Sequence, residues 1–591
     1  MKNAPWFFPI ACLAACGSGV SPGPKEAHTQ ATPSTEPSRA APSSEVYVVA
    51  PIASPSAPLV LKKKSPEFEV NLAKDPEWNH QRSTPAVRTW QFGPLAKRWA
   101  TRVGKTTFRT TMARAGDAIV IGTHGTSLAG MNEASDGIYV LEAATGTKKA
   151  FIKTPGKGDL DIGGIAIAGD TVFFTADNSQ IGAASLSTGK ILWKAATRGK
   201  VRPAPALADL NKDGTLDVIV GDEQGTLYAL NGTNGAKLWS VTTGVNEYNA
   251  KGFIAAVAIV DIGQDGTDDV IAGARDGILT AYRGIDGKVL WQHQYDSGIH
   301  ASPSIADFDQ DGKPEVLAAW SYGQVAILDA STGTPRWLTR LEQDSGGIEG
   351  LFGSPVPIPG APGALIVPTS WWGKEDCIIG VGVDQRVFRS YEERVTASAV
   401  VTDLDGDGTY EGIIGTEKGK LLALTADGRR AVLATLGGGI EASALLDDTD
   451  GDGRYEILVA SNDGLLTCFQ TPSTKKPVLS RFRGNTPDNR GEIGGVKLGW
   501  RSIHQARAEG DFQGRSSAGG VRIDYLLCCK ALTDAATRAP SPENAELLKA
   551  AGACNAAAAA GVDRAAALES LDRNVRDKTT LPKECSGSGS H

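Results

Sequence analysis

The feature that most constrains this chain is a unit of about 45 to 50 residues that recurs along its middle. Residues 206–240, ALADLNKDGTLDVIVGDEQGTLYALNGTNGAKLWS, and residues 304–338, SIADFDQDGKPEVLAAWSYGQVAILDASTGTPRWL, contain the same order of segments. Three apolar segments are separated by an acidic loop and a short turn, and a glycine-containing turn then leads to a segment with Trp. Short apolar segments bounded by Gly, Asn and Asp are typical of β-strands. Each unit is therefore predicted to form a four-stranded sheet.

The repetition of such a sheet is typical of a β-propeller, whose blades bury their faces only by stacking on each other. The fourth strand of each unit has an aromatic or apolar marker, at Trp99, Phe151, Trp193, Trp239, Trp291, Trp337, Phe388 and Leu433. Eight markers predict an all-β, eight-bladed propeller; the alternative has seven blades, without the irregular unit at 352–390, which lacks an acidic loop. The last unit, 442–470, ends after its third strand. We expect the strand around Trp99 to complete that sheet and close the ring.

Five of the first-to-second strand loops share one spacing of oxygen-bearing side chains. Alternate acids, a glycine after the third position and an acid at the ninth suit a calcium ion with six to eight oxygen ligands. An EF-hand would instead need its glutamate at the twelfth position and helices on both sides. The predicted structural Ca2+ ligands are Asp209, Asn211, Asp213 and Asp217; Asp261, Asp265 and Asp269; Asp307, Asp309, Asp311 and Glu315; Asp403, Asp405, Asp407 and Glu411; and Asp448, Asp450, Asp452 and Glu456. The alternative, solvated turns without an ion, would not require this spacing five times.

Two family resemblances follow from these segments. The third and fourth strands, as in TLYALNGTNGAKLWS and ILTAYRGIDGKVLWQ, resemble the PQQ-like repeat of quinoprotein dehydrogenases and of lipoproteins in outer-membrane assembly. The acidic loops resemble the FG-GAP or VCBS repeats of integrin-type propellers. Together the resemblances cover about residues 90–490, and they imply a fold more specifically than a function.

The N-terminus reads as an export signal. Residues 1–15 have a lysine and a short apolar stretch that is too short to span a bilayer. The tetrad LAAC, residues 13–16, resembles the lipobox of bacterial lipoproteins, which implies lipid attachment at Cys16; the alternative is an ordinary signal peptide with a chance cysteine. Residues 16–62 are rich in Pro, Ser, Thr and Ala and are predicted to be a disordered tether. Gly17 favours the outer membrane or cell surface, since it is not the aspartate associated with inner-membrane retention.

A binding surface is predicted on the face opposite the acidic loops. The residue seven positions before each loop varies, as at Arg202, Ile254, His300, Thr396 and Glu441, and Asp161 and Glu349 are its counterparts in two units without acidic loops. Varied residues at a repeated position suit a binding rim, or simply unconstrained loops. Two second-to-third strand turns on this face are enlarged, and the one at 369–377 holds Trp371, Trp372 and Lys374. We interpret Arg202, His300, Glu349, Trp371, Trp372, Lys374 and Glu441 as candidate ligand-binding residues, although the two tryptophans have packing in the irregular sixth unit as an alternative.

The C-terminal segment differs in character from the propeller, which is assigned to residues 63–505. Residues 506–591 are predicted to form a small module with helices, and Ser541-Pro542 suits a helix start. Its cysteines, Cys528, Cys529, Cys554 and Cys585, suggest two disulfides in an exported chain, with three possible pairings. Adjacent cysteines resemble the redox pair of quinoprotein alcohol dehydrogenases, but side chains of neighbours in a helix diverge. Cys377 and Cys468 lie in predicted third strands and are expected to be free thiols.

The formal net charge of −7 and the lack of long basic runs argue against nucleic acid as a partner. The first hypothesis is a non-enzymatic, lipid-anchored, calcium-binding propeller that acts at the cell envelope as a monomeric scaffold for a protein or polysaccharide. No catalytic residue is assigned, and PQQ is not expected as a cofactor. Two enzyme classes stay open as alternatives: a PQQ-dependent quinoprotein dehydrogenase, and a carbohydrate-active enzyme such as a polysaccharide lyase, for which His300 would be the residue to test.

Overall fold

The computed structural model describes residues 94–126, 133–244, 250–295, 297–340, 351–360, 364–368, 377–382, 387–391, 394–426, 428–494 and 498. Within these ranges the chain is all β, with 32 strands and no helix. Accordingly, the described part contains no helix long and apolar enough to cross a membrane. The predicted signal peptide (1–15), tether (16–62) and helical module with its four cysteines (506–591) lie outside the described residues.

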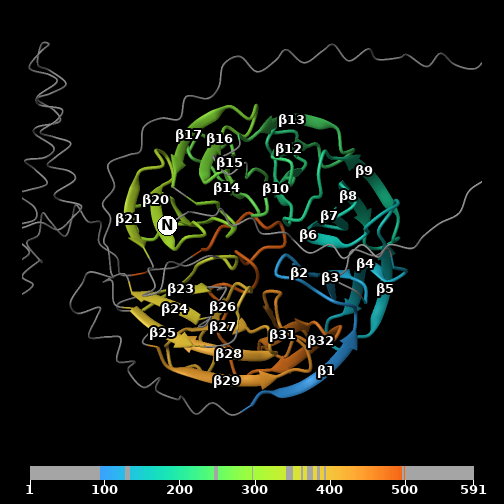
Figure 1. Cartoon of the computed structure of the whole chain (residues 1–591). Helices are drawn as coiled ribbons and strands as arrows, with labels where there is room; N and C mark the ends of the chain where they lie inside the picture. The colour runs from blue at the N-terminus through green and yellow to red at the C-terminus, as the bar shows by residue number, and fades with distance from the viewer. Residues whose placement is uncertain are drawn as a thin grey trace, which may run out of the picture. The chain divides into compact units, whose positions relative to one another are not determined.

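The strands form eight four-stranded antiparallel sheets around a central axis, with the first strand of each sheet nearest the axis (Figure 1). We number these blades from one to eight along the chain. Blade one contains β2 (Met112–Ala115), β3 (Ala118–His124), β4 (Asp136–Glu142) and β5 (Lys148–Lys153). Blade two contains β6 (Ile162–Ala168), β7 (Thr171–Ala176), β8 (Gln180–Ser185) and β9 (Ile191–Ala196). Blade three contains β10 (Ala206–Ala208), β11 (Asp217–Gly221), β12 (Thr226–Leu230) and β13 (Lys237–Thr242), and blade four contains β14 (Ala258–Val260), β15 (Asp269–Gly273), β16 (Ile278–Tyr282) and β17 (Val289–Gln294).

The second half of the ring repeats this arrangement. Blade five contains β18 (Ser304–Ala306), β19 (Glu315–Ala319), β20 (Gln324–Asp329) and β21 (Pro335–Arg340). Blade six, the irregular unit, contains β22 (Val356–Ile358), β23 (Ala364–Pro368), β24 (Cys377–Gly382) and β25 (Val387–Tyr391). Blade seven contains β26 (Val400–Thr402), β27 (Glu411–Gly415), β28 (Lys420–Thr425) and β29 (Arg430–Thr435), and blade eight contains β30 (Leu445–Asp447), β31 (Glu456–Ser461) and β32 (Leu465–Gln470).

The closure of the ring by the N-terminal strand is confirmed. Strand β1 (Ala96–Arg102) pairs antiparallel with β32 and becomes the outer strand of blade eight, with Trp99 opposite Cys468 and Arg102 opposite Leu465. Cys468 is a buried free thiol, as expected. Because the first and last strands share one sheet, the two ends of the repeat region hold each other in place.

Burial follows the position of each strand in its blade. The inner strands β10, β11 and β12 are buried along their whole length, whereas the outer strand β13 alternates between buried and exposed residues. Apolar side chains gather between consecutive blades; one cluster joins Leu227 of blade three to Val270 of blade four. The near-continuous apolar runs of the inner strands, such as DVIVG, are therefore explained by neighbours on both faces.

Four of the tryptophan markers contact a glycine turn of the next blade. Indole nitrogens of the outer strands donate to carbonyls of the following blade: Trp193 to Gly232 at 2.8 Å, Trp239 to Gly284 at 2.6 Å and Trp291 to Ala330 at 2.8 Å. The turn glycines Gly146, Gly235, Gly287 and Gly333 have φ of +68° to +72°, and a Cβ there would lie 2.4 to 2.8 Å from the preceding Trp ring. Trp99 makes this ring contact with Gly146, so blade eight meets blade one as blades two, three and four each meet the next.

Serine hydroxyls connect the inner ends of blades four to eight. Each hydroxyl accepts the backbone N–H of the equivalent residue in the preceding blade: Ser302 from Ala256 (2.9 Å), Ser354 from Ser302 (3.0 Å), Ser398 from Ser354 (2.9 Å) and Ser443 from Ser398 (3.3 Å). These serines are buried. A buried backbone N–H needs an acceptor. These N–H groups lie just before the inner strands, and the serine of the next blade supplies the acceptor.

Removal of one of these hydroxyls should destabilise the propeller. In Ser398→Ala the N–H of Ser354 loses its acceptor in a buried place, and we expect a loss of about 1 to 3 kcal/mol in the free energy of unfolding. Urea denaturation measures the change. The control is Ser240→Ala on the exposed side of β13, for which we expect a change within about 0.5 kcal/mol. If Ser398→Ala and Ser240→Ala unfold at the same urea concentration, the serine hydroxyls do not contribute to the stability of the propeller.

A segment after the last strand closes the central channel, which the sequence did not predict. We call residues 478–493 the strap; it crosses the centre of the ring in Figure 1. Strap carbonyls accept N–H groups from six inner strands: Ile167 to Pro487, Leu207 to Asp488, Ile259 to Arg490, Ile305 to Gly491, Val401 to Leu479 and Leu446 to Ser480, at 2.7 to 2.9 Å. The strap thus satisfies backbone groups of the inner strands that face the axis.

Two arginines of the strap are fully buried. The guanidinium of Arg483 donates to the carbonyls of Pro303 (2.7 Å), Val257 (2.9 Å) and Asn489 (3.1 Å). Arg481 donates to Asn489 Oδ1 at 2.9 Å and to Thr486 O at 3.0 Å. Burial lowers the pKa of Arg481 to about 10 and that of Arg483 to about 9, so both stay charged at neutral pH. At the centre of the ring these two arginines therefore hold the surrounding segments together by hydrogen bonds, mostly to backbone carbonyls.

Candidate functional site

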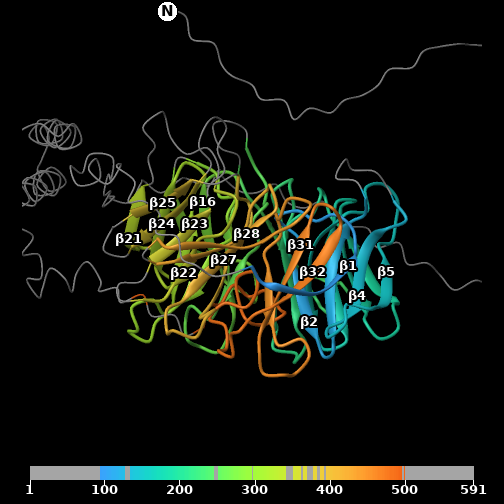
Figure 2. The same cartoon turned by 90° about the horizontal axis from the view of Figure 1, so that it is seen from below.

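The connections between strands lie on two opposite faces of the ring (Figure 2). The first-to-second strand loops, including the five acidic loops, define what we call the acidic-loop face. The second-to-third strand turns and the blade-to-blade connections lie on the opposite side, which we call the rim face. This arrangement agrees with the faces expected from the repeat.

The acidic loops are held in shape by hydrogen bonds to their own carboxylates. The first acid accepts the N–H five residues later in every loop, as Asp307 does from Gly312 at 3.0 Å, and a second N–H four residues later in the first three loops and three residues later in the last two. The glycine after the third acid has a positive φ in all five loops, from +77° to +87°, which explains the glycine at that position. The ninth acid accepts the N–H that follows the first acid, as in Phe308 to Glu315 at 2.8 Å.

Burial among other carboxylates makes the ninth acids hard to ionise without a cation. It raises the pKa of Glu315 and of Glu411 to about 8 and that of Asp217 to about 6. Oε1 of Glu315 is buried and has no hydrogen-bond partner among the described residues. A buried carboxyl oxygen that lacks a donor, beside two further acids, fits an oxygen ligand for a hard cation.

Three loops bring carboxylates close enough together to hold a metal ion. The ligand atoms within each group lie within 4.8 Å of one another: Asp307, Asp309 and Asp311; Asp403, Asp405 and Glu411; and Asp448, Asp450 and Glu456. The other predicted ligands, namely Asp209, Asn211, Asp213, Asp217, Asp261, Asp265, Asp269, Glu315, Asp407 and Asp452, lie in or directly after the same five loops. Acidic clusters suited to a cation are thus present, and calcium itself belongs to the proposal below.

Arginines already contact two of these clusters. Arg98 of the closing strand lies 2.5 Å from Asp450 and 3.0 Å from Glu456. Arg336 of β21 lies 3.4 Å from Asp309 and from Asp311 of the third loop, and 2.5 Å from Asp329. In these two loops a guanidinium already neutralises part of the negative charge that would attract a metal ion. Of the three clusters, the fourth loop, with Glu411, is therefore the clearest choice for testing metal binding.

The rim face carries a cluster of polar and ionisable side chains at blades one to three and at the start of blade eight, which we call the charged rim. It consists of His124, Asp159, Asp161, Asp177, Lys200, Arg202, Glu223 and Glu441. Lys200 lies 2.8 Å from Asp159 and 3.2 Å from Asp177, and Arg202 lies 2.9 Å from Glu223 and 3.4 Å from Asp177. Glu441 accepts a hydrogen bond from Asn462 at 2.6 Å.

A buried pair of side chains belongs to this rim where blade one meets blade two. His124 Nδ1, at the end of β3, lies 2.9 Å from Asp161 Oδ2, just before β6. Burial raises the pKa of Asp161, although the hydrogen bond and charge of His124 act in the opposite direction. The two residues join the connections of neighbouring blades.

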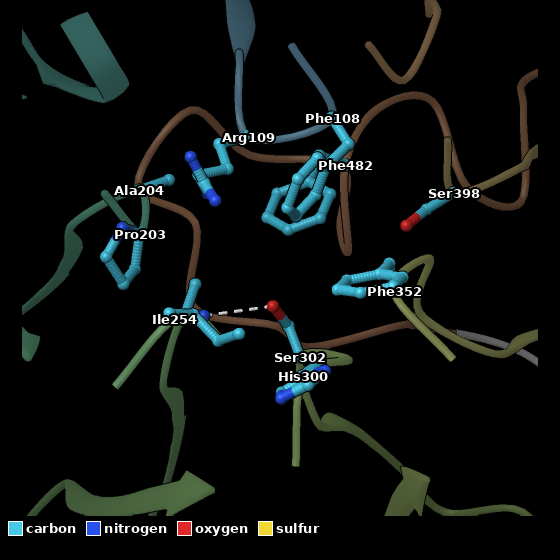
Figure 3. Close-up of a pocket in the computed structure, with 11 residues that line it drawn as sticks. Phe108, Arg109, Pro203, Ala204, Ile254, His300, Ser302, Phe352, Ser398 and Phe482 are labelled. Atoms are coloured by element: carbon cyan, nitrogen blue, oxygen red, sulfur yellow. Dashed lines mark hydrogen bonds between the residues drawn. The ribbon is translucent and has the colours of Figure 1, made fainter. Parts of the chain in front are cut away.

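A small pocket lies near the centre of the ring, between residues of several blades and the strap (Figure 3). Its wall is formed by the connections just before several inner strands and by the strap. The lining residues are aromatic (Phe108, Phe352 and Phe482), apolar (Pro203, Ala204, Ile254 and Ala256) or polar (Arg109, His300, Ser302 and Ser398). Burial lowers the pKa of His300 to about 4, so its imidazole is neutral at pH 7.

The candidate ligand-binding residues have different outcomes. Arg202 and Glu441 lie in the charged rim, and His300 lines the pocket. Glu349, Trp371, Trp372 and Lys374 lie outside the described residues. Sequence reasoning missed Arg109, because the connection before blade one has no acidic loop from which to count. Sequence reasoning also missed His124 and Asp177. Each lies where the second strand of its blade ends, and the residues at this place in the repeat were not compared between units.

The fold and its repeats define a β-propeller built from PQQ-like repeats. A family profile described as "Outer membrane protein assembly factor BamB" matches residues 96–351, which confirms the PQQ-like resemblance. The chain is 22% identical over 180 residues to the protein of that name from Moranella endobia (strain PCIT), covering 30% of this chain and 43% of the relative. It is 29% identical over 147 residues to the one from Vibrio cholerae serotype O1, covering 24% of this chain and 35% of the relative. The chain thus spans less than half the length of these relatives.

Among solved structures, a europium-containing methanol dehydrogenase is similar in fold. The likeness covers 62% of this chain and 85% of that chain at 14% identity, with a TM-score of 0.48. At this identity the likeness concerns the fold alone.

Proposed function

We propose that this chain is a non-enzymatic propeller of the bacterial cell envelope that binds a partner protein through the charged rim. The observation that carries the proposal is the cluster of linked acids and bases on the rim face, in which Lys200 and Arg202 together contact Asp159, Asp177 and Glu223. Charged groups at the edge of an interface steer and orient a partner. The sequence similarity to outer membrane protein assembly factors favours a protein over a polysaccharide as the ligand.

Calcium in the acidic loops and a lipid at Cys16 complete this proposal. The buried Glu315 oxygen without a partner supports a bound cation, and the hard oxygen ligands support calcium. A closed shell of protein oxygens would shape the acidic-loop face rather than take part in a reaction. The lipid anchor and the tether would place the propeller at the outer membrane or cell surface.

The test compares charge reversal on the two faces. Arg202→Glu places a third acid beside Asp177 and Glu223, whereas Arg454→Glu changes an exposed residue of the fifth acidic loop. The immobilised proteins are incubated with detergent extracts of the envelope, and the retained polypeptides are quantified by mass spectrometry. We expect at least one polypeptide to fall about tenfold with Arg202→Glu, to stay with Arg454→Glu, and to be released at high salt.

Two further results decide the outcome. A Trp371→Ala, Trp372→Ala variant should also reduce capture, since both tryptophans belong to the enlarged turn predicted on this face. If both charge variants retain the same polypeptides as the parent, with melting temperatures unchanged, the charged rim is not the binding surface. Binding of added PQQ with a quinone absorbance would instead favour the quinoprotein alternative.

A further inference from the structure

In several blades the outer strand contains an extra residue, in a β-bulge, directly before its marker tryptophan. Strand β1 pairs Lys97 with Phe469 and Trp99 with Cys468, so Arg98 between them has no partner across the sheet. The equivalent extra residues are Leu192 in blade two, Leu238 in blade three, Leu290 in blade four and Arg336 in blade five. A bulge can direct such a side chain to a nearby site. This place is therefore basic in blades five and eight, and leucine in blades two to four.

The bulge in the closing strand places Arg98 against the carboxylates of the fifth acidic loop. Its Nη2 lies 2.5 Å from Oδ2 of Asp450, and its Nη1 lies 3.0 Å from Oε1 of Glu456. The Glu456 side chain is 0% exposed, so its charge has no contact with solvent. Asp450, Glu456 and Asp448 are the three acids of this loop that lie close enough together to hold a metal ion. The guanidinium therefore contacts two of the three side chains that a metal ion would need.

The fourth acidic loop, in blade seven, has the same spacing of acids but a different residue at the bulge. The extra residue of its outer strand is the buried Leu433. Burial raises the pKa of Asp405 in this loop, whereas the hydrogen bond from Arg98 lowers the pKa of Asp450, its counterpart in the fifth loop. A neighbouring positive charge favours the ionised carboxylate. Arg98 thus supplies to the fifth loop the kind of charge that a cation would supply to the fourth.

Blade five also has an arginine at the bulge, but an acid outside the loop holds it. Arg336 lies 2.5 Å from Asp329, at the end of β20, and 3.4 Å from each of the two loop acids that it contacts. Oε1 of Glu315 in this loop is buried and keeps no partner among the described residues. Asp329 pairs across the sheet with the ninth acid of its loop, and the equivalent residue in blade eight is Gln470. Gln470 has no charge, so it does not compete with the fifth loop for Arg98.

We propose that Arg98 takes the place of the metal ion in the fifth acidic loop, so that this loop stays metal-free at calcium concentrations that fill the fourth. The inference rests on calcium as the ion of the other loops, and it narrows that proposal by one loop. Calcium could bind here only if the guanidinium left both carboxylates. Because Arg98 belongs to β1, the same ion pairs hold the closing strand on blade eight. The closure of the ring would then not depend on calcium.

The experiment counts the calcium ions bound by the full-length purified protein. Arg98→Leu introduces the residue that occupies this place in blades two to four. The matched control is Arg102→Leu in the same strand, where the arginine donates to the backbone carbonyl of Asp463 at 3.0 Å. Equilibrium dialysis with labelled calcium, up to about 1 mM free calcium, measures the number of bound ions. We expect Arg98→Leu to bind one more ion per molecule than the parent, and Arg102→Leu to bind the same number. An unchanged number in Arg98→Leu would overturn the proposal.

Substitution of a loop acid shows where the additional ion binds. Asp450→Asn combined with Arg98→Leu should remove that ion, because the fifth loop loses a ligand. Asp450→Asn in the parent should leave the number of ions unchanged, and this measurement decides even if Arg98→Leu folds poorly. Loss of an ion from the parent would mean that the loop binds calcium beside Arg98, which contradicts the proposal.

The melting temperature gives a second, independent measurement. Without calcium, Arg98→Leu should melt at a lower temperature than Arg102→Leu, because the buried Glu456 loses its partner. Calcium should remove most of this difference, since the ion can now take the place of the guanidinium. A difference of the same size with and without calcium would argue against the exchange of one cation for the other.

Failure of this proposal is distinct from failure of the calcium proposal. If the parent binds no calcium but Arg98→Leu binds one ion, calcium in the other loops is wrong and the role of Arg98 stands. If the parent binds calcium and Arg98→Leu adds no ion, the role of Arg98 is wrong and calcium in the other loops stands.

Discussion

Removal of divalent cations should lower the melting temperature of the protein by several degrees, and calcium should restore it. A site that binds only the folded state adds about 2.7 kcal/mol when free calcium is 100 times the dissociation constant. Buried ninth acids such as Glu315 and Glu411, whose pKa values are raised to about 8, gain most from a cation. Differential scanning calorimetry with EDTA, followed by excess calcium or magnesium, measures the effect. An unchanged melting temperature in EDTA would mean that the loops hold no ion.

The substitution Glu411→Gln sharpens this prediction. Gln keeps an oxygen for the N–H of Leu404, now 2.8 Å from Glu411, but cannot become an anion. We expect the variant to be at least as stable as the parent in EDTA and to gain less from calcium. The pH dependence has a definite sign. Since the folded-state pKa of about 8 exceeds the unfolded value of about 4.3, metal-free protein should lose stability as the pH rises between these values. Bound calcium should remove that loss.

Substitution of the buried strap arginine should cause a second large effect. Arg483→Met leaves the carbonyls of Pro303, Val257 and Asn489 without the donors that they have on the axis. Each unsatisfied buried group costs about 1 to 3 kcal/mol, so we expect a loss of about 3 kcal/mol or more in the free energy of unfolding. Urea denaturation measures it, with the exposed Arg454→Met as control. A midpoint within error of the control would show that the strap does not stabilise the ring.

The fold was predictable because each repeat has its own markers. The eight outer-strand markers correspond to eight sheets, and the incomplete last unit correctly placed β1 beside β32. The strap was not predictable, because RFRGNTPDNRG has neither a strand nor a helix period. Its arginines are buried only because carbonyls of distant inner strands surround the axis, and that arrangement exists only once the ring has formed.

Residues of the candidate site were predictable only where their positions could be counted back from an acidic loop in the same unit. Arg202 and Glu441 were found by their distance from the first acid, and they lie in the charged rim. His300 was found in the same way, but it lines the pocket because its ring stacks on Phe352. Arg109 had no such reference in its own unit. The pairing of His124 with Asp161 joins two blades and follows from their geometry, not from either local sequence.

The strap also determines when this protein can finish folding. Its carbonyls accept N–H groups from the inner strands of six blades, from Ile167 to Leu446, so it can dock only after these six blades have taken their places. The closing strand pairs Ala96 with Gln470, so the earliest strand must wait for the latest. A chain synthesised from its N-terminus would therefore keep β1 unpaired until β32 arrives. During that interval the unpaired edge of β1 is open to pairing with other chains, so the late closure of the ring is the step at which aggregation competes with folding.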